Sequence, residues 1–73
     1  MQSYSNVNGN SNVEAYEIGD TYIEVKFGGT ARTYRYSYGS AGMVHVETMK
    51  ELAKQGHGLN SYIMKNVRYG YEK

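Results

Sequence analysis

The chain has 73 residues, no cysteine and a formal net charge of +1. This length holds one hydrophobic core and excludes a second domain, the lack of cysteine excludes disulfides and thiolate metal sites, and the near-neutral charge excludes the strong field that steers many nucleic-acid-binding proteins. The longest apolar run is far shorter than the about 20 residues that span a bilayer. Residues 1–3 also lack signal-peptide features. We therefore expect a soluble, cytoplasmic protein with no membrane contact.

The N-terminal residues 2–12, QSYSNVNGNSN, are rich in Asn and Ser and carry no side-chain charge. Such a composition is typical of disordered segments, and chain ends are poorly ordered unless other parts of the fold hold them. We predict a flexible polar leader over residues 1–12 and a single folded domain over residues 13–71. A role for Tyr4 as a ring that stacks on a ligand is the less favoured alternative.

The first strand pair is predicted from residue 13 onward, where apolar and polar residues begin to alternate. Gly19 and Asp20 then offer a two-residue turn that can close a β-hairpin. With that turn, Tyr16 would lie opposite Ile23 in an antiparallel pair. A longer loop would bring these two residues together only approximately, so the sequence leaves this register open.

A second hairpin is predicted from the strand at residues 21–27 and the glycine pair 28–29, which supplies the positive φ angles of a tight turn. A two-residue loop would place Tyr34 opposite Ile23, on the apolar face of the sheet. Because residues two apart share a face, Tyr36 would point inward as well. We predict both tyrosines as core residues. A slipped register would instead expose them as a stacking platform for RNA bases, and that alternative stays open.

The opposite face of the same strands is predicted to carry Tyr22 across from Arg35 on one side and from Glu17 on the other. A guanidinium over a tyrosine ring forms a modest cation–π contact, and an exposed ion pair adds little more. Arg35 thus remains directed to solvent, where it is one candidate for contact with nucleic acid.

A helix is predicted over residues 43–55, with Gly56 as its stop. Its apolar residues recur at spacings of three and four, as a helix that covers a sheet requires. They are Met43, Val46, Met49, Leu52 and Ala53, while Glu47, Lys50, Glu51 and Lys54 are expected to face solvent.

A second, shorter helix is predicted to begin near Leu59, with Asn60 as its N-cap and Leu59 packed against Met64. Its apolar side comprises Leu59, Tyr62, Ile63 and Val67, and Lys65 and Arg68 face outward before Gly70. These elements predict an α+β fold, in which two C-terminal helices cover one face of a three-stranded antiparallel meander in the order β-β-β-α-α.

Residues 39–42, Gly-Ser-Ala-Gly, have the Gly-x-x-Gly form of the loop that clamps a nucleic-acid backbone in KH domains. They also precede a helix whose amides could receive a phosphate. A KH loop normally lies between two helices and contains a basic residue, whereas here a strand precedes an uncharged loop. We favour an ordinary flexible connection.

Catalysis requires a nucleophile and a base, or paired carboxylates, held together over a cleft, and the sequence shows no such set. The two histidines, His45 and His57, are twelve residues apart and do not form the i, i+4 pair of a metal-binding helix. We expect His45 on a helix surface and His57 in an exposed loop. The sequence thus predicts no catalytic residue, no metal site and no cofactor.

Several cations and an aromatic ring fall on the C-terminal segment, which makes it the best candidate for contact with nucleic acid. The candidates there are Lys65, Arg68, Tyr69 and Lys73, to which Arg35 of the predicted sheet is added. A cluster of this size also occurs on ordinary solvated surfaces, and it is too small for strong phosphate binding.

The order of these elements resembles the KTSC domain, which occurs alone or at the C-terminus of some lysyl-tRNA synthetases. The resemblance covers about residues 13–71 and includes a central Tyr-x-Tyr and the stretch Gly-x-Gly-Leu-Asn-x-x-Ile. The matching residues are Tyr16, Val25, Phe27, Tyr34, Tyr36, Gly56, Asn60 and Ile63. In family members a Val-Pro commonly precedes the helix, whereas this chain has no proline and a different helix entry at residues 37–42.

The resemblance implies RNA binding, which has been proposed for the family, and a structural role for Tyr34, Tyr36 and Asn60. It carries over no synthetase activity, because no synthetase catalytic region is present. Our hypothesis is a non-catalytic binding module with weak affinity for RNA. The alternative is a protein-interaction or assembly module that uses the exposed sheet edge and the tyrosine-rich C-terminal segment. The sequence leaves the oligomeric state open.

Overall fold

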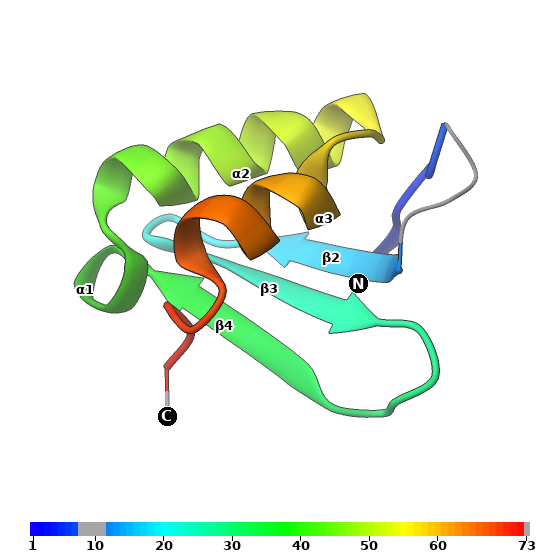
Figure 1. Ribbon diagram of the computed structural model, residues 1–73, viewed down its shortest axis with the longest axis horizontal. Coiled ribbons are helices and arrows are strands. Elements are labelled where there is room, and N and C mark those ends of the chain that lie inside the picture. The colour runs from blue at the N-terminus through cyan, green and yellow to red at the C-terminus, as the bar shows by residue number, and fades with distance from the viewer. Residues whose placement is uncertain (8–11, 73) are drawn as a thin grey trace.

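The computed structural model describes residues 1–7 and 12–72. They form an antiparallel sheet in the order β1-β2-β3-β4, with helices over one face (Figure 1). The strands are β1 (Gln2–Ser3), β2 (Val13–Ile18), β3 (Tyr22–Phe27) and β4 (Thr33–Ser37), and the helical elements are α1 (Tyr38–Ala41), α2 (Met43–Gln55), α3 (Leu59–Tyr62) and the π-helical η1 (Ile63–Val67).

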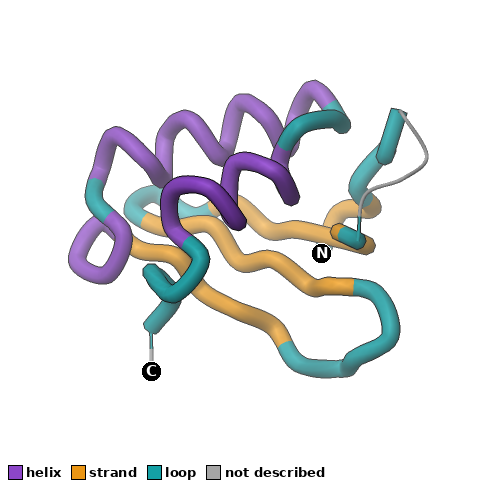
Figure 2. The backbone as a smooth tube through the Cα atoms, viewed as in Figure 1, coloured by secondary structure: helices purple, strands orange, loops and turns teal. Residues whose placement is uncertain are grey.

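The α+β class is confirmed, with one strand more than predicted. Figure 2 shows α2, α3 and η1 in one layer and the strands in another, with α3 and η1 running beside α2 on the same face. In the described part of the chain, no helix is long and apolar enough to cross a membrane.

The additional strand comes from the N-terminal segment, where a disordered leader was predicted. Gln2 and Ser3 pair with β2, and Tyr4 is only 6% exposed. The Tyr4 ring packs edge-on against Tyr16, with centroids 6.5 Å apart, and its hydroxyl accepts a hydrogen bond from the Leu59 N–H at 3.3 Å. The burial of a large ring with a satisfied hydroxyl offsets the cost of ordering this segment. The leader prediction is therefore wrong for residues 2–4, while residues 8–11 lie outside the described residues.

Both hairpins are paired two residues away from the predicted register, because both loops are longer than the tight turns expected. Tyr16 lies opposite Val25 rather than Ile23, and Tyr34 lies opposite Val25, with Tyr36 opposite Ile23. Since side chains alternate with a period of two, a two-residue shift keeps these residues on their predicted faces. The inward orientation is thus confirmed: Tyr36 is 1% exposed and Tyr34 is half-buried against the core. The shift is different at Val13, because a bulge between Val13 and Ala15 changes the β2–β3 register there by one residue.

Helix α2 has the predicted bounds and buries Val46, Met49 and Ala53. Gly56 ends it in the left-handed region with φ 79°, where its N–H bonds to carbonyls of the last turn. The predicted stripe is wrong at its first position, since Met43 is 58% exposed. It is also wrong at Lys50, which was expected in solvent but is only 8% exposed.

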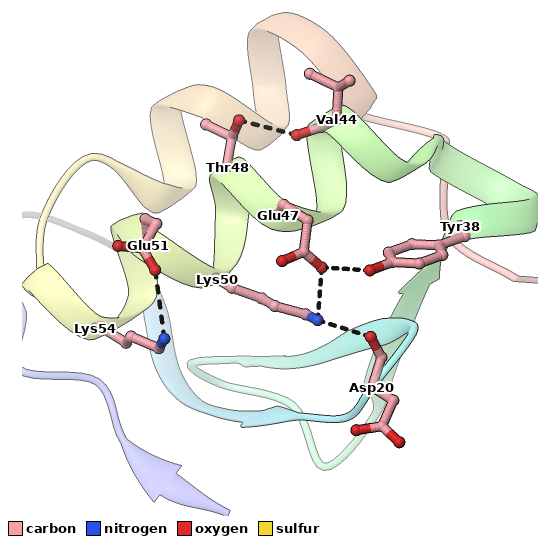
Figure 3. Close-up of polar contacts among 8 residues, drawn as sticks. All are labelled: Asp20, Tyr38, Val44, Glu47, Thr48, Lys50, Glu51 and Lys54. Atoms are coloured by element: carbon pink, nitrogen blue, oxygen red, sulfur yellow. Dashed lines mark hydrogen bonds and ion pairs between the residues drawn. The ribbon is translucent and has the colours of Figure 1, made fainter.

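Polar contacts explain the burial of Lys50 (Figure 3). Its Nζ donates to the Asp20 carbonyl oxygen at 3.0 Å and pairs with Glu47 at 2.7 Å. The Tyr38 hydroxyl donates to the same carboxylate at 2.6 Å. Hydrogen bonds from Lys50 and then Tyr38 hold the pKa of Glu47 below its usual value, and the bond to Glu47 raises the pKa of Tyr38. This network joins α2 to α1 and to the loop between β2 and β3.

The segment 38–41 forms a helical turn, so the prediction of a flexible connection is wrong. Ser37 and Ser40 form a capping box: the Ser40 N–H donates to the Ser37 hydroxyl at 3.2 Å, and the Ser37 N–H donates to the Ser40 hydroxyl at 3.0 Å. These bonds satisfy backbone donors that the start of a helix leaves free. The uncharged Gly-Ser-Ala-Gly stretch thus builds the entry to α2.

Helix α3 begins two residues earlier than the predicted cap implies, since its N-cap is Gly58 and not Asn60. Gly58 precedes it with φ 83°, and no side chain caps its N-terminus, so the N-cap prediction for Asn60 is wrong. Leu59, its first residue, is fully buried. The predicted apolar side is correct for Leu59, Ile63 and Val67, which all enter the core.

Candidate functional site

A groove of about 440 Å³ lies between the β3–β4 hairpin, η1 and the segment that follows η1. Aromatic side chains form much of its surface, and the described residues contribute no carboxylate to it. The lining residues are Asn12, Phe27, Gly28, Thr30, Tyr34, Tyr36, Asn60, Met64, Arg68, Tyr69 and Tyr71.

Packed rings fix the shape of the groove. The Tyr34 ring lies 5.6 Å from that of Phe27 and 4.8 Å from that of Tyr71, in edge-to-face arrangements. Such pairs add stability beyond the area that they bury. Tyr69 is different, because 70% of it is exposed. The groove thus combines a rigid aromatic wall with one ring that is free to contact a ligand.

Tyr36 is the most deeply buried residue of this aromatic cluster. Burial, and then the nearby Tyr34 and Tyr71, raise the pKa of its hydroxyl to about 12. Because the ionised form is disfavoured in a poorly solvated site, the Tyr36 hydroxyl stays neutral throughout the physiological range. It therefore contributes shape and a neutral polar group to the groove.

The wall that carries Tyr71 is attached to the free edge of β4. The Glu72 N–H donates to the Arg35 carbonyl oxygen at 2.7 Å, and the Gly70 N–H closes the preceding turn on the Val67 carbonyl oxygen at 2.8 Å. These backbone bonds hold Tyr71 over Tyr34 and also cover part of an edge that was predicted to be exposed.

The cations near the groove differ from the other described cations in their ion pairing. Arg32 lies over the Tyr34 ring, 5.0 Å from its centroid, and Arg68 lines the groove. Across residues 1–7 and 12–72, neither of these nor Lys65 forms an ion pair with a carboxylate, whereas the other cations do. The paired cations are Lys26, Arg35, Lys50 and Lys54.

A second cavity, of about 450 Å³, adjoins the groove between the α1–α2 entry and η1. Met64, Arg68 and Tyr69 line both cavities, so the two adjoin along one side of η1. The second cavity is more polar and likewise has no carboxylate from the described part of the chain. Its other lining residues are Ser40, Ala41, His45, Lys65, Asn66, Val67 and Gly70.

Most of the residues singled out from the sequence lie at these two cavities. The groove brings together Tyr34, Tyr36, Asn60, Arg68 and Tyr69, and Lys65 lines the adjoining cavity. Lys73, also predicted, lies outside the described residues. Both tyrosines point inward as predicted: Tyr36 is a core residue, and the half-buried Tyr34 forms part of the groove wall.

Arg35 is the predicted contact that the structure does not bring to the groove. Its guanidinium stacks over the Tyr22 ring, 4.0 Å from the centroid, and pairs with Glu24 at 3.4 Å. The predicted cation–π contact is confirmed, but it lies on the opposite face of the sheet. A strand alternation that points Tyr34 and Tyr36 inward necessarily points Arg35 away from them.

The sequence did not identify Phe27, Arg32 or Tyr71 as site residues. Arg32 is two residues before Tyr34, and the period-two rule could have placed them on one face. Tyr71 gave no such signal, because its position depends on a turn after η1 that returns the chain to β4. This contact is long-range and has no local sequence pattern.

The two histidines differ in their surroundings. The His45 Nδ1 is 2.7 Å from the Tyr62 hydroxyl, so this ring is partly buried and not simply a surface residue. His57 is exposed, as expected. Within residues 1–7 and 12–72, no group of three His, Cys, Asp or Glu side chains is placed to hold a metal ion.

Comparisons with models of protein families, with curated proteins and with solved structures found no match. The resemblance to the KTSC domain therefore stays a prediction. The interpretation of the groove rests on its own geometry and charge.

Proposed function

We propose that this domain is a non-catalytic binding module that holds single-stranded RNA weakly in the aromatic groove. The observation that carries the proposal is the combination of ring-lined walls, unpaired cations and a lack of carboxylates among the described lining residues. The resemblance to the KTSC domain, for which RNA binding has been proposed, agrees with this conclusion.

Stacking supplies the first part of the interaction. Base–aromatic stacking contributes about 1–3 kcal/mol per base and tolerates any sequence, because every base has a π-face. Tyr69 is 70% exposed at the groove, and its ring is available for such contact. A groove of about 440 Å³ is of a size that accepts a splayed base. Single-stranded RNA presents such bases, whereas a duplex keeps them stacked.

Electrostatics supplies the second part. A cation that already forms an ion pair must give up its partner before it can bind phosphate. Arg32, Lys65 and Arg68 have no such partner among the described carboxylates, so their charge is available to a ligand. With a chain net charge of +1, the long-range attraction is small, and we expect affinity in the micromolar range at low salt.

Fluorescence anisotropy with a labelled single-stranded RNA tests the proposal. We expect Arg68→Ala and Tyr69→Ala each to weaken binding several-fold, and added salt to weaken it further. Arg35→Ala is the matched control, because it removes an arginine from the opposite face of the sheet. No binding at micromolar protein in low salt, or an equal loss in the Arg35 and Arg68 variants, would refute the proposal.

A protein-interaction module is the second candidate, favoured by apolar exposure at the start of α2. Met43 is 58% exposed and its neighbour Val44 is 72% exposed. Adjacent exposed apolar side chains are typical of contact surfaces when they belong to a larger patch. Light scattering after size-exclusion chromatography tests self-association through this surface. A dimer that Val44→Ser dissociates would support this candidate, and a monomer at all concentrations would argue against it.

A further inference from the structure

We infer that the groove and the adjoining cavity together form a subsite for one nucleotide, with the base in the groove and its phosphate in the adjoining cavity. This inference rests on the proposed function and specifies how it is carried out. It assigns separate tasks to two sets of side chains, one aromatic and one cationic.

The first argument is that the two cavities are neighbours. Arg68, Met64 and Tyr69 line both, so a ligand in the groove lies next to the second cavity and contacts side chains that also line it. Arg68 lies at the junction, where a guanidinium can bind a phosphate with two parallel N–H donors. Lys65 lines only the second cavity and adds a point charge there.

The difference in lining is the second argument. The groove has Phe27, Tyr34 and Tyr71 in its walls, which suits an apolar, planar base. The adjoining cavity has none of these rings and is lined by small, polar and cationic groups. Because neither cavity has a carboxylate from the described residues, nothing there repels a phosphate.

The neutral polar groups of the second cavity already have partners. The Ser40 hydroxyl bonds to Ser37, the Asn66 amide donates to the Tyr62 carbonyl oxygen at 3.2 Å, and His45 contacts the Tyr62 hydroxyl. Phosphate recognition therefore depends on Lys65 and Arg68. The side chain of Asn60 differs, since it lines the groove and bonds to no other described residue. Its amide offers a donor and an acceptor to the edge of a base.

An NMR titration of the whole chain tests this inference, with adenosine, adenosine 5′-monophosphate, adenosine 3′-monophosphate and inorganic phosphate as separate probes. We expect one or both nucleotides to bind about tenfold more tightly than adenosine at low salt, since charge-assisted bonds to a phosphate stabilise the complex. Adenosine should shift the groove amides only, Arg68 included, and the nucleotide should shift the amides of residues 65–67 in addition.

Two variants test the binding of the base and of the phosphate separately. Lys65→Gln should remove much of the preference for nucleotide over nucleoside, and it should lower the salt dependence of RNA binding by about 0.7 in the log–log slope. Tyr69→Ala should weaken adenosine and RNA alike while leaving that slope unchanged. Both residues are exposed, so both variants should fold.

The outcomes distinguish this inference from the function on which it rests. If single-stranded RNA binds and Tyr69→Ala weakens it, but adenosine and both nucleotides bind equally, the nucleotide subsite is wrong and the proposed function stands. A Lys65→Gln variant with an unchanged salt slope would also overturn the subsite. If RNA itself does not bind, the proposed function and the subsite both fail.

Discussion

Two regions of this domain use the same kinds of side chain in opposite ways. Around Lys50, a cation is buried beside Glu47 and donates to a backbone carbonyl oxygen (Figure 3). Around the groove, Arg68 and Lys65 line cavities to which the described residues contribute no carboxylate. The first region therefore uses its charge to join elements of the fold, and the second leaves its charge available to a ligand.

The difference arises from the neighbours of each cation. Lys50 lies three residues after Glu47, so both project from the same side of α2 toward the Tyr38 ring. Arg68 lies beyond η1, among tyrosines that offer it no charge. A comparison of cations by partner therefore indicates a candidate ligand site, which the small net charge of the chain does not reveal.

The largest expected effect is at Tyr36, where the groove and the core meet. We expect Tyr36→Ala to destabilise the domain by roughly 3–5 kcal/mol, as truncation of a buried aromatic ring does. Tyr36→Phe keeps the ring and should cost less than about 1.5 kcal/mol. Urea denaturation measures both. Equal stability of the Ala and Phe variants would show that the tyrosine pair does not support the core.

Alkaline pH should reveal the same burial. The pKa of Tyr36 is raised to about 12 in the folded domain from 10.0. The stabilisation that this raised pKa contributes is therefore fully present below pH 10. It falls as pH rises from 10 toward 12, because the Tyr36 hydroxyl of the unfolded chain loses its proton before that of the folded domain. The loss should reach roughly 2 kcal/mol. Tyr36→Phe should lack this component of the pH dependence, and an unchanged profile in that variant would contradict the assignment.

Removal of Lys50 should affect stability and leave RNA binding intact. We expect Lys50→Ala to cost roughly 1–2 kcal/mol, through the lost bond to the Asp20 carbonyl and the lost packing of its stem. Lys65→Ala is the matched control, because its side chain is exposed and should change stability by less than about 0.5 kcal/mol. Denaturation and RNA anisotropy should show that Lys50→Ala loses stability but not RNA binding, and that Lys65→Ala loses RNA binding but not stability. The same pattern in both variants would contradict the difference between the two regions.

The smallest expected effect is at Arg35. Arg35→Gln removes a half-exposed ion pair and a cation–π contact, which together should contribute less than about 1 kcal/mol. We expect RNA affinity to remain within the error of the wild type. A loss of binding as large as that of Arg68→Ala would place the interface on the opposite face of the sheet.

The sequence predicted much of this fold, because its strongest signals are periodic. Helix α2 has its expected bounds. Tyr36 points inward as predicted, although the predicted register of its hairpin was wrong by two residues. An even shift cannot move a side chain to the other face. The loops were the source of error, since glycine pairs indicate a turn but do not fix its length.

The parts that could not be predicted depend on contacts between distant residues. Tyr4 is ordered because it packs against Tyr16 and bonds to the start of α3, whereas its own surroundings in the sequence suggest disorder. Tyr71 reaches the groove because Glu72 bonds to β4. Arg68, Tyr69 and Asn60 were selected from the sequence, but only the folded chain shows that they share one groove.

The most direct test of the central claim is an amide-resolved NMR titration of the whole chain with single-stranded RNA, which both detects binding and locates it. We predict that the amides of Asn60, Met64 and residues 68–71 shift with added RNA, while those of Glu24 and Lys50 remain unchanged. Shifts centred on Tyr22 and Arg35, or on Met43 and Val44, would contradict the account, and so would an unchanged spectrum at low salt.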